Sequence, residues 1–200
     1  MPATKSARMQ QIENEIQNLT GSPLYAYRQE NDYLPVIGEG DLEARILLIG
    51  EAPGKNEAKS GRPFVGAAGK VLDELLEQIH LQRDQVYITN IIKDRPPENR
   101  DPTEEEIKLY GPFLDQQINI IQPKVIVTLG RFAMDFILDR FDLPQHGEKI
   151  SELHGQFLEG QASYGEVLIL PVFHPAAIIY RRAWKNLLRE DFMQLRDYLE

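Results

Sequence analysis

The sequence predicts an α/β fold of three layers, α/β/α, with a central parallel sheet of four strands between the helices. Short apolar runs alternate along the chain with longer segments of helical periodicity. Such alternation implies parallel strands joined by right-handed crossovers. The chain has 200 residues, 42% hydrophobic and 26% charged, which is enough to bury a core. We therefore expect one domain over residues 1–200.

The N-terminal part of the chain predicts one helix and an irregular segment. Apolar residues recur at helical spacing over residues 6–19, which favours an amphipathic helix. Residues 23–44 contain several turn residues and predict an irregular segment that wraps around the core. We expect about the first ten residues, 1–10, to be disordered or loosely docked.

The first predicted strand, Arg45–Ile49, ends in a stiff turn, Gly50-Glu51-Ala52-Pro53-Gly54. Glycine permits backbone angles that other residues resist, and proline fixes its own φ. Ligands of open α/β sheets bind beyond the carboxyl ends of the strands, so we expect a site at this turn. The residues that follow predict a polar loop over residues 55–63 and then a helix that buries Val71, Leu72, Leu75, Leu76 and Ile79.

The remaining elements continue the alternation of strand and helix. Thr103 with Glu106 three residues later forms a capping box, which predicts the start of a helix that ends near Ile121. The other patterns predict, in order, a strand Gln85–Ile92, a stiff loop over 93–102, a strand Val125–Leu129, a helix after Gly130, a turn-rich stretch 142–165 with a short hairpin around 154–157, a strand Val167–Phe173 and a helix over 176–199.

Composition excludes several classes of function. The chain has no cysteine, which excludes disulfides, thiolate catalysis and cysteine-ligated metal sites. The formal net charge of −9 argues, taken as a total, against non-specific nucleic-acid binding. No apolar stretch is long enough to span a membrane or to form a signal peptide. We expect a cytoplasmic monomer that has no membrane partner.

Three of the four predicted strands deliver a polar side chain at their carboxyl ends: Glu51, Asn90 and His174. Each alone has a plain explanation, as a solvated carboxylate, a turn cap or a surface histidine. Parallel strands share one edge, however, so the three side chains can converge. An Asn amide can read the Watson–Crick edge of a base, and a histidine can donate to a carbonyl oxygen that gains charge. A carboxylate can orient water or stabilise a sugar cation.

Phe64, shortly after the turn, could stack on such a base, although core packing is the commoner role of phenylalanine. The motifs around these residues occur in order: Gly50–Gly54 with Gly61–Gly69, Thr89–Lys93 with Arg95–Pro97, and His174–Ala177. They resemble the motifs of family 4 uracil-DNA glycosylases, over about residues 19–195. The resemblance implies the uracil-DNA glycosylase fold and an enzyme that hydrolyses the N-glycosidic bond of uracil in base excision repair. Uracil-containing DNA is the implied substrate.

The resemblance also implies roles around the turn. The backbone of Gly50, Glu51 and Ala52 holds uracil, and Glu51 itself acts on water or on the sugar cation. Glu57 matches an acidic position near C5 of uracil, where it helps to exclude thymine.

The other implied roles concern the base itself. Phe64 stacks on the flipped uracil, Asn90 pairs with its N3 and O4 edge, and His174 steadies the anion that develops at O2. We therefore expect Glu51 and His174 to be the catalytic residues.

The chain departs from the family at the four positions where members typically hold a [4Fe–4S] cluster on cysteines. The matching residues are Leu19, Ser22, Asp94 and Tyr110. None of them can supply a thiolate, which such clusters need, so we predict no cluster and no other cofactor. Leu19 and Tyr110 suit an apolar and aromatic replacement, and Asp94 could pair with Arg28 or Arg95.

Basic residues gather near the predicted catalytic edge despite the acidic total. A solvated helix face is the plain alternative for them. The residues that we expect to contact DNA are Lys55, Arg62, Lys93, Arg95, Arg100, Arg181, Arg182 and Lys185.

Two other functions remain open from the sequence. One is a non-catalytic module that binds uracil-DNA or a nucleotide, which intact Glu51, Asn90 and His174 disfavour. The other is a glycosylase for another deaminated base, such as hypoxanthine, because the sequence does not show the width of the pocket.

Overall fold

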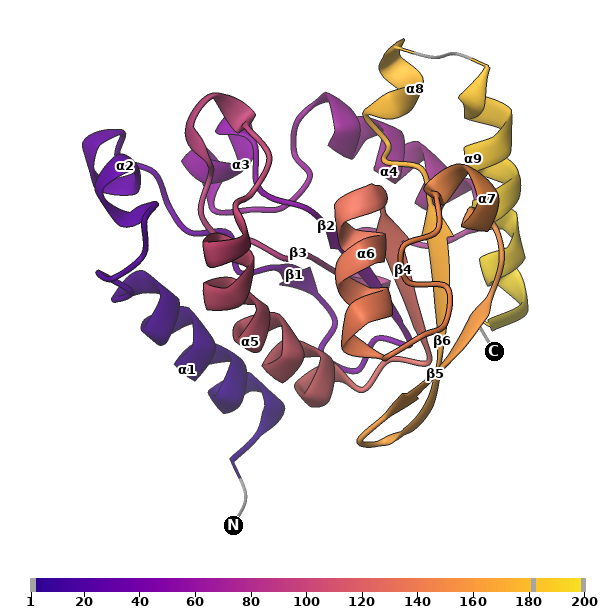
Figure 1. Ribbon diagram of the computed structural model, residues 1–200, viewed down its shortest axis with the longest axis horizontal. Helices are drawn as coiled ribbons and strands as arrows, with labels where there is room; N and C mark the ends of the chain where they lie inside the picture. The colour runs from indigo at the N-terminus through magenta and orange to yellow at the C-terminus, as the bar shows by residue number, and fades with distance from the viewer. Residues whose placement is uncertain (1–2, 181–182, 199–200) are drawn as a thin grey trace.

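A six-stranded sheet lies between two layers of helices in the computed structural model, which describes residues 3–180 and 183–198 (Figure 1). The strand order is β1-β3-β2-β4-β6-β5. The four central strands are parallel, which confirms the predicted fold class. β1 and β5 add an antiparallel strand at each edge, so the prediction of only four strands was wrong.

The central strands are buried on both faces, as parallel strands covered by helices must be. The sequence pattern did not predict the two edge strands. One of them has only two residues, and the other alternates buried and exposed positions around a glycine. The strands are β1 (Glu39–Gly40), β2 (Ile46–Gly50), β3 (Tyr87–Asn90), β4 (Val125–Leu129), β5 (Leu158–Ala162) and β6 (Gly165–Val172).

Two sets of helices cover the two faces of the sheet. The first set is α1 (Lys5–Gln17), α5 (Glu104–Ile121) and α6 (Arg131–Arg140). The second is α4 (Ala67–Gln78), α9 (Trp184–Met193) and the 3-10 helix η3 (Gln194–Tyr198). Shorter elements connect them: α2 (Tyr25–Glu30), α3 (Lys55–Ser60), η1 (Arg83–Gln85), η2 (Pro97–Asn99), α7 (Ile150–Leu153) and α8 (Ala177–Tyr180).

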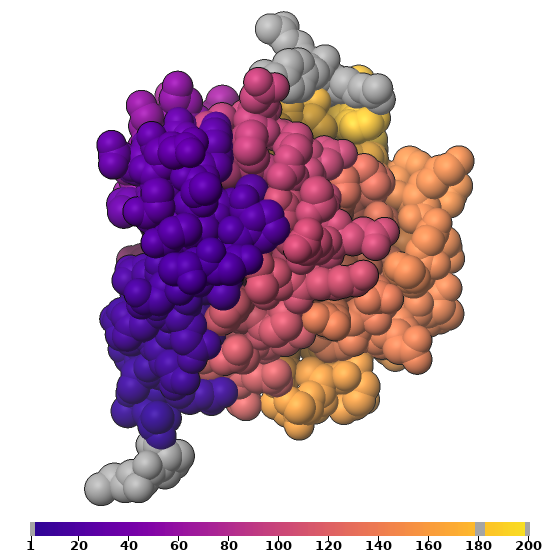
Figure 2. Space-filling view, turned by 60° about the vertical axis from the view of Figure 1, so that its left-hand side comes forward, coloured from indigo at the N-terminus to yellow at the C-terminus, as the bar shows by residue number. Residues whose placement is uncertain are grey.

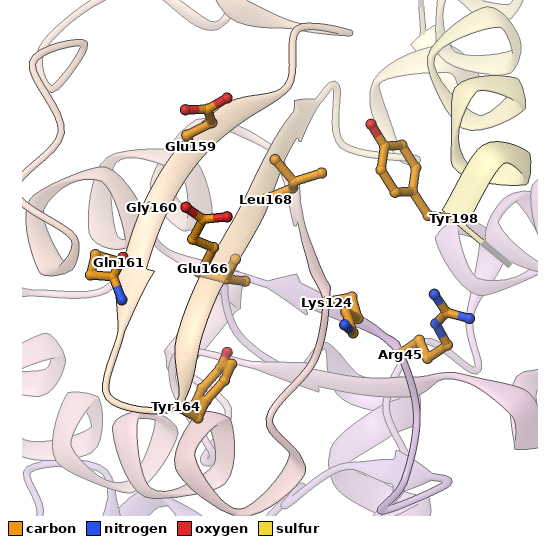
Figure 3. Close-up of a pocket in the computed structure, with 10 residues that line it drawn as sticks. Arg45, Lys124, Glu159, Gly160, Gln161, Tyr164, Glu166, Leu168 and Tyr198 are labelled. Atoms are coloured by element: carbon orange, nitrogen blue, oxygen red, sulfur yellow. The ribbon is translucent and has the colours of Figure 1, made fainter. Parts of the chain in front are cut away.

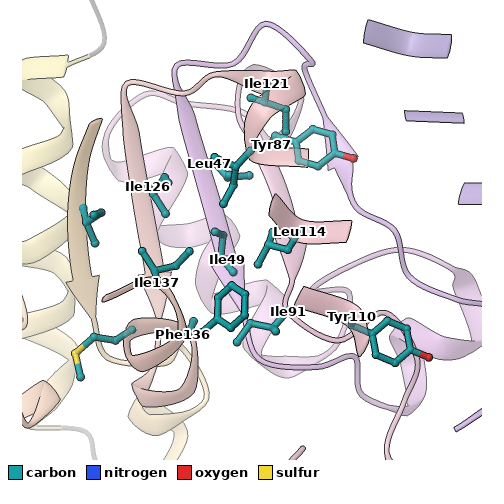
Figure 4. Packing of buried hydrophobic residues seen from close by; sticks show 14 of the residues in the cluster. Leu47, Ile49, Tyr87, Ile91, Tyr110, Leu114, Ile121, Ile126, Phe136 and Ile137 are labelled. Atoms are coloured by element: carbon teal, nitrogen blue, oxygen red, sulfur yellow. The ribbon is translucent and has the colours of Figure 1, made fainter. Parts of the chain in front are cut away.

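Alternating side chains of each strand pack against different helix layers. Leu47 and Ile49 of β2 face α1, α5 and α6, where they meet residues such as Leu114 (Figure 4). Ile46 and Leu48 of the same strand face α4 and α9. Each strand therefore needs apolar residues at successive positions, which explains the continuous apolar runs in the sequence.

The N-terminal segment packs along α5 and forms a continuous layer on one side of the molecule (Figure 2). Helix α1 begins at Lys5, so residues 5–10, which we expected to be loosely docked, are helical. The Lys5 ammonium donates to the carbonyl oxygens of Leu42 and Ile121, at 3.2 Å each. These bonds fix the start of α1 against the rest of the domain.

Several local predictions were wrong. The expected loop over 55–63 contains α3, which is too short to show periodicity and ends at Gly61 with φ +71°. The expected hairpin around 154–157 is instead the β5–β6 pair, which turns at residues 163–164. The single helix expected over 176–199 consists of α8, α9 and η3 within the described residues.

The capping box that opens α5 is confirmed, since Thr103 and Glu106 exchange hydrogen bonds of 2.8 and 3.2 Å. The segments α3, η2 and α8 follow β2, β3 and β6, so they gather beyond the carboxyl ends of the strands, at the top of Figure 1. The candidate site lies at this edge of the sheet.

Candidate active site

The turn after β2 is held to the neighbouring strand by its backbone. The amides of Ile91 and Ile92 donate to the carbonyl oxygens of Gly50 and Glu51, at 2.9 and 3.0 Å. A Cβ on Gly50 would overlap with Oδ1 of Asn90 and lie 2.6 Å from the Phe64 ring. Glycine is therefore required at this position, because the amide and the ring both lie against its backbone.

The imidazole ring of His174 also lies next to the Phe64 ring. The two ring centroids are 5.7 Å apart, with their planes tilted by 30°. Gly130, at the end of β4, adopts φ +95°, and a Cβ there would lie 3.0 Å from Cβ of His174. The sequence pattern marks Gly130 only as the boundary between a strand and a helix, and its role in making room for the histidine depends on the fold.

The environment of His174 fixes its protonation. The backbone amide of Ala176 donates to Nδ1 of His174 at 3.1 Å, so the proton of the neutral ring sits on Nε2. Burial lowers the pKa of His174 to about 4. The ring is therefore neutral at pH 7 and offers one N–H donor from Nε2.

Glu51 is a carboxylate with an unusual proton affinity. Burial raises its pKa to about 7; the charge of Asp101 also raises it, and that of Arg131 lowers it. At neutral pH the carboxyl group is close to half ionised. A group with this pKa can accept a proton from water, which suits a general base.

The structure therefore brings together most of the residues predicted for the pocket. Gly50, Asn90, Phe64 and His174 form a continuous chain of contacts, with Glu51 next to Gly50 in the turn. Ala52 packs against the apolar core beside the turn. The set offers an aromatic face, a planar amide, a neutral N–H donor and a carboxylate of raised pKa.

Glu57 holds the backbone of the loop that carries Phe64. Its Oε1 accepts the amides of Val65 and Gly66, at 2.8 and 2.7 Å. Its Oε2 lies near Gly54, where an added Cβ would be 2.7 Å away. Its carboxylate thus connects the turn after β2 to the start of α4.

Phe64 carries backbone strain at this point. Its φ is +51°, in the left-handed region that L residues other than glycine rarely adopt. Such a conformation costs about 1–2 kcal/mol. Strain of this kind persists only where surrounding contacts hold it, and it clusters at functional sites.

The prediction that Lys93 contacts DNA was wrong. Its side chain is fully buried, and its ammonium donates to Oγ1 of Thr89, the carbonyl oxygen of Asn90 and Oε1 of Gln117, at 2.8, 2.7 and 2.5 Å. Burial lowers the pKa of Lys93 well below its usual range. The side chain braces the strand end that carries Asn90 from inside the protein.

Arg95 also turns inward, which contradicts its predicted DNA contact. Its guanidinium donates to the hydroxyls of Tyr27 and Tyr33 and to Oδ1 of Asn99, and only 9% of the residue is exposed. Arg181 and Arg182 lie outside the described residues.

The other predicted contacts are accessible. Lys55 is exposed on α3. Arg62, Arg100 and Lys185 keep exposed surface, and each pairs with one carboxylate: Glu39, Glu106 and Glu74 respectively.

A buried polar network occupies the positions where the family resemblance places cluster cysteines. The Tyr110 hydroxyl lies 2.8 Å from Oγ of Ser22 and donates to Asp94 at 2.6 Å. Arg28 donates to both Asp94 oxygens at 3.1 Å, which identifies the arginine partner as Arg28 rather than Arg95. Leu19 packs at the edge of the apolar core.

These residues do not fit an iron–sulfur cluster. They supply hydroxyl and carboxylate oxygens that already bond to one another, whereas such clusters are held by thiolates. Burial raises the pKa of Asp94, while the Tyr110 hydroxyl and Arg28 favour its charged form. Within the described residues, no group of three or more His, Cys, Asp and Glu side chains is arranged to hold a metal ion.

A cavity of about 650 Å³ lies away from this site, at the amino ends of the strands (Figure 3). Arg45 and Lys124, which precede β2 and β4, line it together with Tyr164 and Tyr198. None of the residues predicted for catalysis or base recognition contributes to it. In the part of the chain that is described, none of the helices combines the length and apolar character of a membrane span.

Comparison with known proteins identifies close relatives. Residues 37–196 match the model of the uracil DNA glycosylase superfamily. A type-4 uracil-DNA glycosylase of Sulfurisphaera tokodaii is 42% identical over 94% of this chain and 84% of its own length. The type-4 enzyme of Archaeoglobus fulgidus is 44% identical over 84% and 83% of the two chains, and that of Thermotoga maritima 37% over 98% and 97%.

The burial of Lys93 predicts that this residue supports the fold rather than DNA contact. We expect Lys93→Met to lower the free energy of unfolding by about 2 kcal/mol, because buried acceptors such as the carbonyl oxygen of Asn90 lose their donor. Urea denaturation measures this change. The slope of log Kd for DNA against log salt should remain that of the wild type.

The matched control is Lys55→Met, an exposed lysine on α3. It should change the free energy of unfolding by less than about 0.5 kcal/mol. A smaller salt slope in Lys93→Met, with normal stability, would contradict the buried role.

Proposed function

The chain belongs to the uracil-DNA glycosylase superfamily, and we propose that its strand-end site removes uracil from DNA by hydrolysis. The observation that carries this proposal is the contact chain of Gly50, Asn90, Phe64 and His174 beside Glu51. The reaction breaks the N-glycosidic bond and leaves an abasic site for base excision repair. Water supplies the hydroxyl group that ends on C1′ of the sugar.

Recognition of the base would use the flat faces and edges of the site. A base inside a duplex cannot be reached, so the uracil must leave the stack, and a mismatched uracil costs less to extrude. Phe64 stacks on the extruded ring, and the Asn90 amide pairs with its N3 and O4 edge. The backbone of Gly50, Glu51 and Ala52 borders the base. The position of the Asn90 amide against Gly50 supports this arrangement.

Catalysis would rest on two groups of opposite character. Uracil leaves as an anion, and the Nε2–H of neutral His174 donates to its O2, where charge develops. The sugar becomes cationic, and Glu51 in its ionised form stabilises it or takes a proton from the attacking water. The low pKa of His174 and the raised pKa of Glu51 support these roles.

Glu57 would contribute to the selectivity for uracil, and exposed cations would bind the DNA. Glu57 lies beside the turn, where its carboxylate borders C5 of the bound uracil and also accepts the two amides that follow Phe64. Lys55, Arg62, Arg100 and Lys185 are the accessible cations that we assign to phosphate contact. Arg181 and Arg182 follow α8 in the chain and remain candidates.

We also infer that the chain is one domain and uses no iron–sulfur cluster. The family match spans residues 37–196, and both helix layers pack on the same sheet. The network of Arg28, Asp94, Tyr110 and Ser22 supports the second inference, because it fills the cluster positions with mutually bonded side chains.

Uracil excision can be tested directly. The protein is incubated with a labelled oligonucleotide that carries one uracil, and abasic sites are cleaved with alkali. We expect cleavage by the wild type, and a loss of about a hundredfold or more in His174→Ala and Asn90→Ala. His146→Ala changes an exposed histidine outside the site and should retain full activity. An inactive wild type would refute the function, and two fully active variants would refute the site.

The raised pKa of Glu51 predicts the pH dependence of the reaction. The ionised carboxylate is the active form, so the single-turnover rate should rise about tenfold between pH 6 and pH 8. The pKa of His174 is about 4, so this residue does not change its protonation between pH 6 and pH 8. Glu51→Gln should be slower and flat over the same range. If the rate of this variant still rose between pH 6 and pH 8, the group that titrates would be a residue other than Glu51.

The buried network predicts a stability effect and a colourless protein. Arg28→Met leaves Asp94 buried without its cation and should lower the free energy of unfolding by about 3 kcal/mol, measured by urea denaturation. Adding Asp94→Leu should restore most of this loss. The exposed pair Lys108–Glu104 is the control, and Lys108→Met should lower the free energy of unfolding by less than about 0.5 kcal/mol.

The purified wild type should be colourless. Stoichiometric iron in it would overturn the inference that the protein uses no iron–sulfur cluster.

A further inference from the structure

The strained backbone of Phe64 is held by a residue far away in the sequence. Arg83, in η1, donates from Nη2 to the carbonyl oxygen of Pro63 at 2.6 Å and from Nη1 to that of Phe64 at 3.2 Å. Glu57 accepts the next two amides, those of Val65 and Gly66. Arg83 therefore binds the carbonyl groups of Pro63 and Phe64, and Glu57 binds the two amides that follow the left-handed residue.

The guanidinium of Arg83 is itself fixed in place. Its Nε donates to Oε1 of Glu39 on β1 at 2.8 Å, and its Nη1 donates to Oδ1 of Asp73 on α4 at 2.9 Å. Glu39 belongs to an edge strand of the sheet, and Asp73 belongs to a helix that packs on the sheet. A planar guanidinium with several fixed partners has little freedom, so it defines the position of the two carbonyl groups that it binds.

Close packing against α4 restricts the backbone of Phe64. A Cβ on Gly69 would overlap with the carbonyl oxygen of Phe64, so α4 approaches that peptide as closely as a glycine allows. In front, the ring contacts the Gly50 backbone and lies beside His174. A change in the backbone angle of Phe64 would therefore move its ring out of contact with Gly50 and His174.

We propose that Arg83 is a positioning residue for uracil excision, which holds the Phe64 ring at the angle that stacks on the extruded base. This inference rests on the proposed function and adds a residue that lies outside the pocket. Arg83 acts through Phe64 and does not touch the substrate. Its removal should therefore matter only while the Phe64 ring is present.

A double-mutant cycle tests this dependence. Arg83→Met, Phe64→Ala and the double variant are compared in single-turnover excision from a uracil oligonucleotide. Loss of base stacking should lower the activity of Arg83→Met by about tenfold, mainly through weaker substrate binding. In the Phe64→Ala background, Arg83→Met should change activity by less than about twofold.

Two further variants separate positioning from general stability. Asp73→Ala removes one partner of Arg83 but keeps its bonds to the two carbonyl groups, so it should retain wild-type activity. Arg83→Lys keeps a donor for one carbonyl oxygen and should recover part of the loss. Circular dichroism and thermal unfolding establish that each variant is folded at the assay temperature, and the cycle is run with Arg83→Lys if Arg83→Met is not.

The outcomes are distinct. Equal losses from the Arg83 substitution with and without the Phe64 ring, in a wild type that excises uracil, would overturn the positioning role alone. A wild type that does not excise uracil would overturn the proposed function itself. A loss confined to the background that contains Phe64 would support the role of Arg83.

Discussion

The absence of a side chain at Gly50 is the constraint on which the site depends. Asn90 and Phe64 both approach the backbone of this residue more closely than a methyl group would permit. The approach is possible because Gly50 pairs in register with Asn90 on the neighbouring parallel strand. The Asn90 amide and the Phe64 ring therefore both lie against the backbone of Gly50, and His174 lies next to the Phe64 ring.

Buried polar side chains hold the segments that surround this contact. Lys93 fastens the end of β3 to its interior acceptors, and the next residue, Asp94, fastens the following loop to Arg28. The two side chains bond in separate networks although their residues are adjacent. Removal of Arg28 would leave the Asp94 carboxylate buried without its cation, and removal of Lys93 would leave buried acceptors without their donor, so both networks depend on these side chains. The start of the loop after Asn90 is therefore held by the side chains of Lys93 and Asp94.

Local patterns explain why much of the fold could be predicted. Apolar runs such as Ile46–Ile49 and the capping box at Thr103 depend on residues that are neighbours in the chain. The same applies to Glu51, Asn90 and His174, because residues at carboxyl ends of parallel strands must lie at one edge. Helix α3 and the edge strand β1 could not be predicted, because they have too few residues for a periodic pattern.

The parallel sheet, the helices around it and the motifs at its carboxyl edge could be read from the amino-acid sequence, because periodicity and turn chemistry are local properties. The inward positions of Lys93 and Arg95, the pairing of Asp94 with Arg28 and the contact of Arg83 with the Phe64 loop became visible only in the folded chain. A charged side chain has the same local sequence signal whether water or a buried acceptor surrounds it. Its partners come from distant parts of the chain, and their distances exist only once the sheet and its helices have packed.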